Sequence, residues 1–183
     1  MTDRAQLIAA REEKIARLLA PYRRCPVEPG EKRDRFYMDA ALTLARAAAE
    51  EGEVPVGCVI VRDGAILGAD YNGREGFRTA LWHAETAAIG KACDALGGWR
   101  LPGCTLYVTL EPCPMCAGAI WNARIPRVVI GAKDAKAGAM GSLLNLNSYP
   151  LNYKSDVVFG VMEEEAGEVL RAFFLNRRKR KTE

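Results

Sequence analysis

Histidine and long apolar runs are both scarce in this chain of 183 residues. No apolar stretch reaches the roughly 18 residues of a membrane-spanning helix, so we expect no membrane partner. The first residues, MTDRAQLIAAREEKIARLL, carry charges throughout, unlike the apolar segment of a signal peptide. We therefore expect a cytoplasmic protein. The single histidine, His83, limits any metal site in one chain to one imidazole ligand.

Cysteine is the other residue type here that readily holds a soft metal ion, and the chain has six. In an intracellular protein of this size, cysteines are more often thiols or metal ligands than parts of a disulfide framework. Apolar residues make up 49% of the chain and charged residues 27%, which is ordinary for a domain with a packed core. The cysteines to consider are Cys25, Cys58, Cys93, Cys104, Cys113 and Cys116.

Positive charge is concentrated at the end of the chain. The last seven residues, RRKRKTE, carry five positive charges and one negative charge, whereas the whole chain has a net charge of +3. Such a run either contacts the phosphates of a nucleic acid, or complements the negative end of a helix and improves solubility. The charge pattern alone favours the second interpretation.

Residues 1–33 have the pattern of a helical appendage and linker before one main domain at 34–183. Apolar residues recur with helical spacing over residues 3–20, and a proline ends the pattern. The next stretch, PYRRCPVEPGEKR, contains three prolines and a glycine and indicates a linker. Asp34 then stands where an N-cap would begin the first helix of the main domain.

The main domain shows strands and helices that alternate after an initial hairpin. An Asp-Gly pair is typical of a hairpin turn and joins the first two strands. The alternation favours an α/β fold, a three-layer α/β/α sandwich around a mixed five-stranded sheet. Long loops are predicted at 73–80 and 133–155. The expected elements are a helix from 34, strands at 54–61 and 65–71, a helix at 83–96, a strand at 104–110, a helix at 114–123, a strand at 127–131, a strand in DVVFGVM and a C-terminal helix.

Two short motifs supply candidate metal ligands. LWHAETAAI places Glu85 two residues after His83, and TLEPCPMCAGAI places Cys113 and Cys116 three positions apart. Two thiolates at this spacing can hold one metal ion, and a helix N-terminus favours thiolate over thiol. With one imidazole added, a tetrahedral zinc ion keeps its fourth position for water, which is the pattern of catalytic zinc.

Glu85 acquires a role beside such a metal. A carboxylate next to the bound water can take a proton from it and pass that proton to a substrate nitrogen. Each part alone has an ordinary explanation, because a single histidine is often a packing residue and a Cys-x-x-Cys pair also occurs in redox and structural zinc sites. Together, His-x-Glu followed by Pro-Cys-x-x-Cys is the pattern of zinc-dependent base deaminases.

The sequence resembles the bacterial tRNA-specific adenosine deaminases of the cytidine deaminase superfamily over about residues 36–180. The resemblance implies a cytidine deaminase-like fold and hydrolytic conversion of adenosine to inosine at the wobble position of a tRNA anticodon. It also implies a homodimer with one Zn2+ per subunit and the tRNA anticodon arm as partner. The stretches that carry it are ALTLARAAAEEGEVPVGCVIV, TLYVTLEPCPMCAGAI, ARIPRVVIGAKDAKAGAMGSLLNL and FFLNRRKRK.

The family motifs also imply roles for single residues. His83, Cys113 and Cys116 would bind zinc, and Glu85 would move protons. The implied substrate contacts are Asn72 to the purine, Val54 and Ala84 in the base pocket, and Asp134 to a ribose 2′-hydroxyl. The candidate RNA contacts, each with an ordinary surface or packing role as the alternative, are Lys133, Lys136, Tyr149 or Tyr153, Arg177, Arg178, Lys179 and Arg180.

Two segments depart from the family pattern. Many members have Asp-Pro-Thr-Ala before the zinc histidine, whereas this chain has TALW, which puts bulky Trp82 beside His83. The loop at 147–155 has no histidine, although relatives often carry one there. Neither departure touches the zinc chemistry, but both bear on the substrate. Two other functions therefore stay open, namely a deaminase of a free base, nucleoside or nucleotide, and a catalytically silent zinc module that binds RNA.

Overall fold

The computed structural model describes residues 3–179 of the chain. Its elements follow the predicted order, with three short helices added, one in each of the two predicted long loops and one at the start of the linker. They are α1 (Arg4–Leu18), η1 (Ala20–Tyr22), α2 (Glu31–Glu50), β1 (Gly57–Arg62), β2 (Ala65–Tyr71), α3 (Arg74–Phe77), α4 (Ala84–Leu96), β3 (Thr105–Leu110), α5 (Pro114–Asn122), β4 (Arg127–Ala132), η2 (Leu146–Ser148), β5 (Asp156–Val158) and α6 (Glu163–Lys179).

The five strands form one mixed sheet in the order β2-β1-β3-β4-β5. β1 runs antiparallel to both of its neighbours, while β3, β4 and β5 run parallel to one another. Asp63 and Gly64 both have positive φ and close the turn between β1 and β2, as the Asp-Gly pair predicts. The predicted mixed five-stranded sheet is confirmed.

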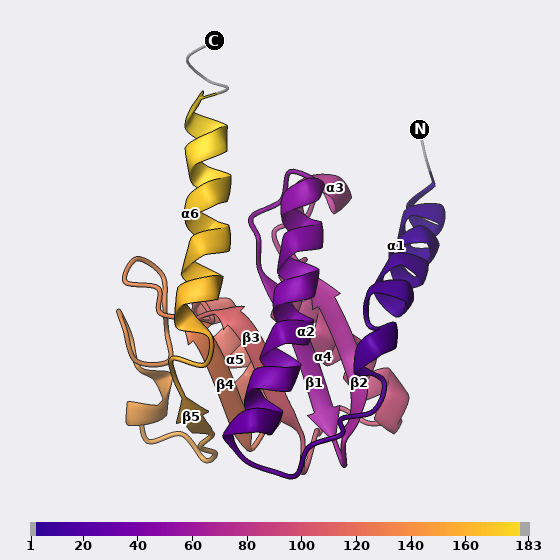
Figure 1. The fold of residues 1–183 in the computed structure, drawn as a ribbon. Helices are drawn as coiled ribbons and strands as arrows, with labels where there is room; N and C mark the ends of the chain where they lie inside the picture. The colour runs from indigo at the N-terminus through magenta and orange to yellow at the C-terminus, as the bar shows by residue number, and fades with distance from the viewer. Residues whose placement is uncertain (1–2, 180–183) are drawn as a thin grey trace.

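Helices cover both faces of the sheet (Figure 1). On one face, Val59 and Val61 of β1 pack in a core that includes buried residues of α1, α2 and α6. On the other face, Cys58 and Ile60 pack in a second core with α4 and α5. A central strand that is apolar on both sides is what a sheet covered on both faces requires. The three-layer α/β/α sandwich is therefore confirmed.

Asp34 does not cap the helix, so this prediction was wrong. α2 begins three residues earlier, at Glu31, with Gly30 in the cap position. Asp34 is buried and accepts two hydrogen bonds of 2.8 Å from the Arg127 guanidinium and one of 3.0 Å from the Tyr107 hydroxyl. A carboxylate gains more from a bidentate guanidinium than from a backbone amide at a helix end. The ion pair ties α2 to β4.

The N-terminal helix packs against the main domain. Ile15 and Leu19 are buried in the same core as α2, and the α1 helix lies beside β2 at the edge of the sheet (Figure 1). The division between an appendage at 1–33 and a domain at 34–183 stays a prediction, although α2 already begins at residue 31. Among residues 3–179, no helix has the length and apolar content needed to cross a membrane.

The topology gathers several chain segments at one edge of the sheet. β2, β3 and β4 end at this edge, and β1 begins there because it is antiparallel to its neighbours, as the pairs Gly57↔Tyr71 and Leu110↔Ala132 show. α4 and α5 start at the same edge, since each connects the end of one strand to the start of the next. Loops at the carboxyl ends of such strands are where α/β proteins bind ligands.

Candidate metal centre and substrate pocket

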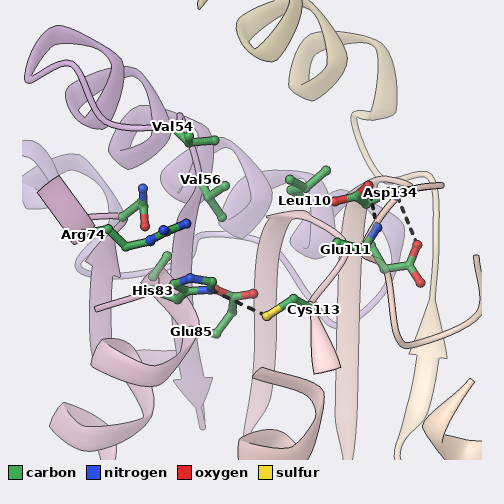
Figure 2. Close-up of a pocket in the computed structure, with 12 residues that line it drawn as sticks. Val54, Val56, Arg74, His83, Glu85, Leu110, Glu111, Cys113 and Asp134 are labelled. Carbon is green, nitrogen blue, oxygen red and sulfur yellow. Dashed lines mark hydrogen bonds between the residues drawn. The ribbon is translucent and has the colours of Figure 1, made fainter. Parts of the chain in front are cut away.

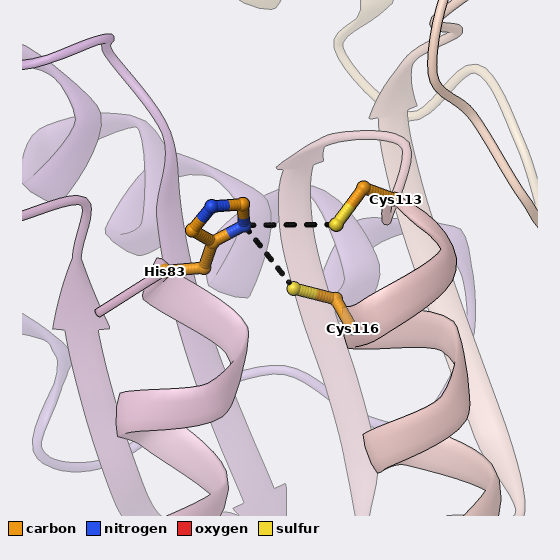
Figure 3. A group of neighbouring side chains, drawn as sticks. All are labelled: His83, Cys113 and Cys116. Carbon is orange, nitrogen blue, oxygen red and sulfur yellow. Dashed lines mark hydrogen bonds between the residues drawn. The ribbon is translucent and has the colours of Figure 1, made fainter. Parts of the chain in front are cut away.

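His83, Cys113 and Cys116 meet at the N-termini of α4 and α5 (Figure 3). His83 occupies the N-cap position of α4, and Cys113 occupies that of α5, with a proline at the first helical position. The Nδ1 atom of His83 lies 3.7 Å from Sγ of Cys113 and 3.4 Å from Sγ of Cys116. Residues separated by thirty positions in the sequence thus form one cluster.

The cluster fits a tetrahedral zinc ion. Zn–S and Zn–N bonds of ordinary length, at the tetrahedral angle, place a ring nitrogen about 3.6 Å from each sulfur. The observed separations of 3.4 and 3.7 Å bracket this value, and all three ligand atoms lie within 4.8 Å of one another. Two thiolates and one imidazole are also the donor set that zinc prefers. The predicted zinc cofactor is thus supported by geometry as well as by residue type.

Hydrogen bonds among the three side chains of this cluster shift their pKa values. A hydrogen bond from the Cys116 thiol lowers the pKa of Cys113 to about 4, and the same hydrogen bond raises the pKa of Cys116. The Cys113 sulfur in turn raises the pKa of His83 by accepting a hydrogen bond from it. The lowered pKa favours the thiolate form of Cys113, and so do the positive ends of the two helix dipoles.

Glu85 lies in the first turn of α4, only 4% exposed, and it faces the cavity beside this cluster (Figure 2). Burial raises the pKa of its carboxyl to about 7. A carboxyl with such a pKa can both take up and release a proton near neutral pH, as general acid–base catalysis requires. The structure therefore places the predicted proton carrier beside the predicted metal ligands.

A cavity of about 160 Å³ opens above the cluster (Figure 2). All four residues predicted to contact the substrate line it, although they come from four different segments of the chain. Val54 precedes β1, Asn72 follows β2, Ala84 begins α4 and Asp134 follows β4. The other lining residues, which sequence reasoning did not single out, are Val56, Arg74, Leu110, Glu111 and Ala137.

The carboxylate of Glu53 fixes the orientation of the Asn72 side chain. The side-chain amide of Asn72 donates a hydrogen bond of 3.1 Å to Glu53, and the backbone N–H of Gly76 donates one of 2.8 Å to the same carboxylate. Glu53 is 3% exposed and lies in the connection between α2 and β1. Because the Asn72 nitrogen points at Glu53, the orientation of its oxygen toward other partners is fixed as well.

Glu111 organises the loop that carries Asp134. Its carboxylate accepts hydrogen bonds from the backbone amides of Asp134 (3.1 Å), Met140 (3.0 Å) and Ser142 (3.0 Å). A Cβ atom on Gly138 would lie 2.4 Å from this carboxylate, so only glycine fits there. The Asp134 side chain uses one oxygen to accept from two amides of its own turn. Sequence gives no sign of this role, because Glu111 looks like an ordinary residue after a strand.

The predicted RNA contacts lie outside this cavity. Lys136, Arg177 and Arg178 line a second, open cavity of about 820 Å³ together with apolar residues of α6. Lys133 is exposed, and Tyr149 is 54% exposed. Tyr153 instead packs under Arg124 and donates a hydrogen bond to its carbonyl, which favours a packing role. Arg180 lies outside the described residues, whereas Lys179 is the last residue of α6.

Known proteins that are similar to this chain agree with a zinc site formed by His83, Cys113 and Cys116. Residues 31–132 match the model of the cytidine and deoxycytidylate deaminase zinc-binding region. The chain is 50% identical over 149 residues to the tRNA-specific adenosine deaminase of Bacillus subtilis, covering 81% of this chain and 92% of that protein.

Two solved structures are also similar. One comes from a study of A-to-I editing by tRNA:A34 deaminases at the wobble position of transfer RNA; it is 47% identical, has a TM-score of 0.71 and covers 73% of this chain and 98% of its own. The other is a guanine deaminase of Bacillus subtilis, 41% identical, with a TM-score of 0.52, covering 58% of this chain and 68% of its own. From the fold, the zinc ligands and these relatives, the chain belongs to the cytidine and deoxycytidylate deaminase superfamily, within the family of the tRNA-specific adenosine deaminases.

Proposed function

We propose that this protein hydrolyses adenosine to inosine at the wobble position of a tRNA anticodon. The observation that carries the proposal is the joint placement of His83, Cys113 and Cys116 at zinc-binding distances, with Glu85 buried beside them. The relatives that are 42–50% identical to this chain, and that it matches over 86–94% of their own length, are tRNA-specific adenosine deaminases, which supports adenosine in tRNA as the substrate.

The residues divide the chemistry among them. When bound by the three ligands, zinc supplies a Lewis acid that brings the pKa of a bound water toward neutrality. Glu85 takes a proton from the attacking water and delivers it to N1 of the adenine. The water oxygen adds to C6, Glu85 takes the second proton from the resulting hydroxyl and passes it to the amino group, and the C6–N6 bond breaks as ammonia leaves and the C6 carbonyl forms. Asn72, held by Glu53, orients the purine.

The RNA contacts follow from the surface around the cavity. Asp134 lies at the rim, where the free oxygen of its carboxylate can accept from a ribose 2′-hydroxyl and so favour RNA over DNA. Lys136, Arg177 and Arg178 form a basic surface along α6 that suits the phosphates of an anticodon arm. Exposed Tyr149 offers a ring on which an unpaired base can stack.

The assembly and the location belong to the same proposal. A homodimer is supported by exposed apolar side chains in the loop before η2, where Leu143 and Leu144 are 55% and 43% exposed. The mass of the purified protein in solution, measured by light scattering, tests this point, and a monomer would contradict it. We place the protein in the cytoplasm because its proposed substrate, tRNA, functions there.

The test compares substrates and one variant. Zinc-loaded protein should convert an anticodon stem-loop with adenosine at the wobble position and leave free adenosine, cytidine and guanine unchanged. Fast turnover of free guanine would favour the activity of the guanine deaminase relative instead. Glu85→Ala should keep one zinc per chain and lose deamination, because the ligands stay while the proton carrier is gone. Activity that survives this substitution would refute the assigned role of Glu85.

A further inference from the structure

The N-terminal helix contacts the loop that carries Asn72, and the inference drawn from this contact rests on the proposed role of Asn72 in substrate binding. α1 lies before residue 31, where the match to the deaminase family model begins. We call residues 72–82, between β2 and His83, the substrate loop. This loop includes Asn72 and Arg74, which line the cavity, and it ends beside the first metal ligand.

Arg11 of α1 reaches under the start of the substrate loop. It is only 7% exposed, which is rare for an arginine in a surface helix. Its guanidinium donates to the backbone carbonyls of Tyr71 and Asn72, and its Nε donates a hydrogen bond of 2.7 Å to Asp70. Asp70 is fully buried at the end of β2. The planar guanidinium of Arg11 therefore joins α1 to the edge strand β2 and to Asn72, the residue proposed to orient the purine.

Aromatic side chains continue this contact across the loop. The ring of Phe77 stacks on Trp82 with centroids 3.9 Å apart, and the Arg11 guanidinium lies 5.4 Å from the Phe77 ring. Arg4, also on α1, lies 5.8 Å from the Trp82 ring, within range of a cation–π interaction. Trp82, which departs from the family pattern, is thus part of the surface that contacts α1.

Gly73 shows how closely these groups pack. A Cβ atom at this position would lie 3.0 Å from Phe77 and from Trp82, and 3.2 Å from the Arg11 guanidinium. The backbone of Gly73 has φ of −150°, which any residue can adopt. A side chain at position 73 would therefore press on the α1 arginine and on the two stacked rings, which would have to shift to make room for it.

We propose that α1 is a brace for the substrate loop and that Arg11 is a positioning residue, which holds Asn72 and Trp82 in the arrangement that binds the adenosine of the RNA. The hydrogen bonds of Arg11 fix the backbone at the start of the substrate loop, and the stacked rings of Phe77 and Trp82 fix its end. The hydrogen bonds of Arg11 reach Asp70, Tyr71 and Asn72 and none of the three metal ligands, so we expect the brace to act on substrate binding and to leave zinc binding unchanged.

Two variants separate positioning from stability. Arg11→Lys keeps a positive charge beside Asp70, but a single ammonium cannot reproduce the fork that reaches both carbonyls. Asp70→Asn removes the negative charge and keeps an acceptor oxygen for Nε, so the bonds from Arg11 to the loop remain. Arg17→Ala serves as a matched control, because it removes an exposed arginine from the same helix.

The readouts are hydrogen exchange of the substrate loop in the full-length protein and separate kcat and KM values on an anticodon stem-loop. Arg11→Lys should speed exchange at 72–82 and lower kcat/KM roughly tenfold with unchanged zinc content. Asp70→Asn should lower the melting temperature without this local change, and Arg17→Ala should do neither. Gly73→Ala should reproduce the Arg11→Lys pattern by steric displacement.

The inference is overturned if Arg11→Lys leaves loop exchange and kcat/KM at wild-type values, or if Asp70→Asn and Arg11→Lys change them equally. An inactive wild-type protein would count against the proposed function only, since loop exchange still reports whether α1 acts as a brace.

Discussion

Replacing Glu111 by glutamine tests how far one buried carboxylate supports the cavity wall. The carboxylate accepts from three backbone amides. A glutamine in its better orientation keeps an oxygen toward Met140 and Ser142 but turns an N–H group toward the N–H of Asp134. One hydrogen bond is lost, the partly buried N–H of Asp134 loses its partner, and two charge-assisted bonds become neutral, which together cost about 2–4 kcal/mol.

The assay is urea unfolding of zinc-loaded Glu111→Gln next to wild type, with zinc content measured in both. Urea unfolding should show this loss as a lower free energy of unfolding. For a chain of this size, the same loss should lower the melting temperature in a thermal scan by roughly 5–15 °C. Deamination should fall as well, because Asp134 lines the cavity on the loop that Glu111 holds. Glu13→Gln, at an exposed site on α1, is the matched control and should change nothing. A Glu111→Gln protein with the stability and activity of wild type would refute the reasoning.

Three further outcomes follow from other contacts in the structure. Tyr37→Phe removes a hydrogen bond of 2.8 Å to the Gly64 carbonyl and should cost about 1 kcal/mol at neutral pH. Burial raises the pKa of Tyr37 to about 12. The wild-type protein should therefore be more stable than the variant below pH about 10, and this difference in free energy of unfolding should disappear as the pH rises through about 12. A difference that stays constant in urea unfolding over this pH range would contradict the prediction. Asp34→Asn breaks the pair with Arg127 and should cost about 2 kcal/mol by the same measurement, whereas a loss below about 0.5 kcal/mol would mean that the pair contributes little. Asn72→Ala should raise KM for the stem-loop with zinc content unchanged, and an unchanged KM would remove Asn72 from substrate binding.

The metal centre could be predicted from the sequence because its ligands lie in two short motifs. Two motifs each place their ligands within a single helix start, so the folded arrangement needs only the two helices to begin at the same edge of the sheet. Alternating strands and helices dictate that arrangement. For the same reason, the five-stranded sheet and its hairpin follow from apolar patterning and one Asp-Gly turn.

The roles of the supporting carboxylates and of the α1 brace could not be predicted from the sequence. Glu53, Glu111 and Arg11 act on partners that are 19 to 61 positions away, and nothing in their immediate neighbours distinguishes them from surface charges. Asp34 shows the opposite case, because its local pattern favours a helix cap while a distant guanidinium binds its carboxylate. Such roles depend on which charges become buried together, and only the tertiary packing decides that.

The most direct measurement of the central claim is the position of inosine in a synthetic anticodon stem-loop that carries adenosine at the wobble position and elsewhere in the loop. After incubation with protein that holds one zinc per chain, nuclease digestion and mass spectrometry should find inosine at the wobble position alone. Unchanged wobble adenosine in the presence of that zinc-loaded protein would contradict the account.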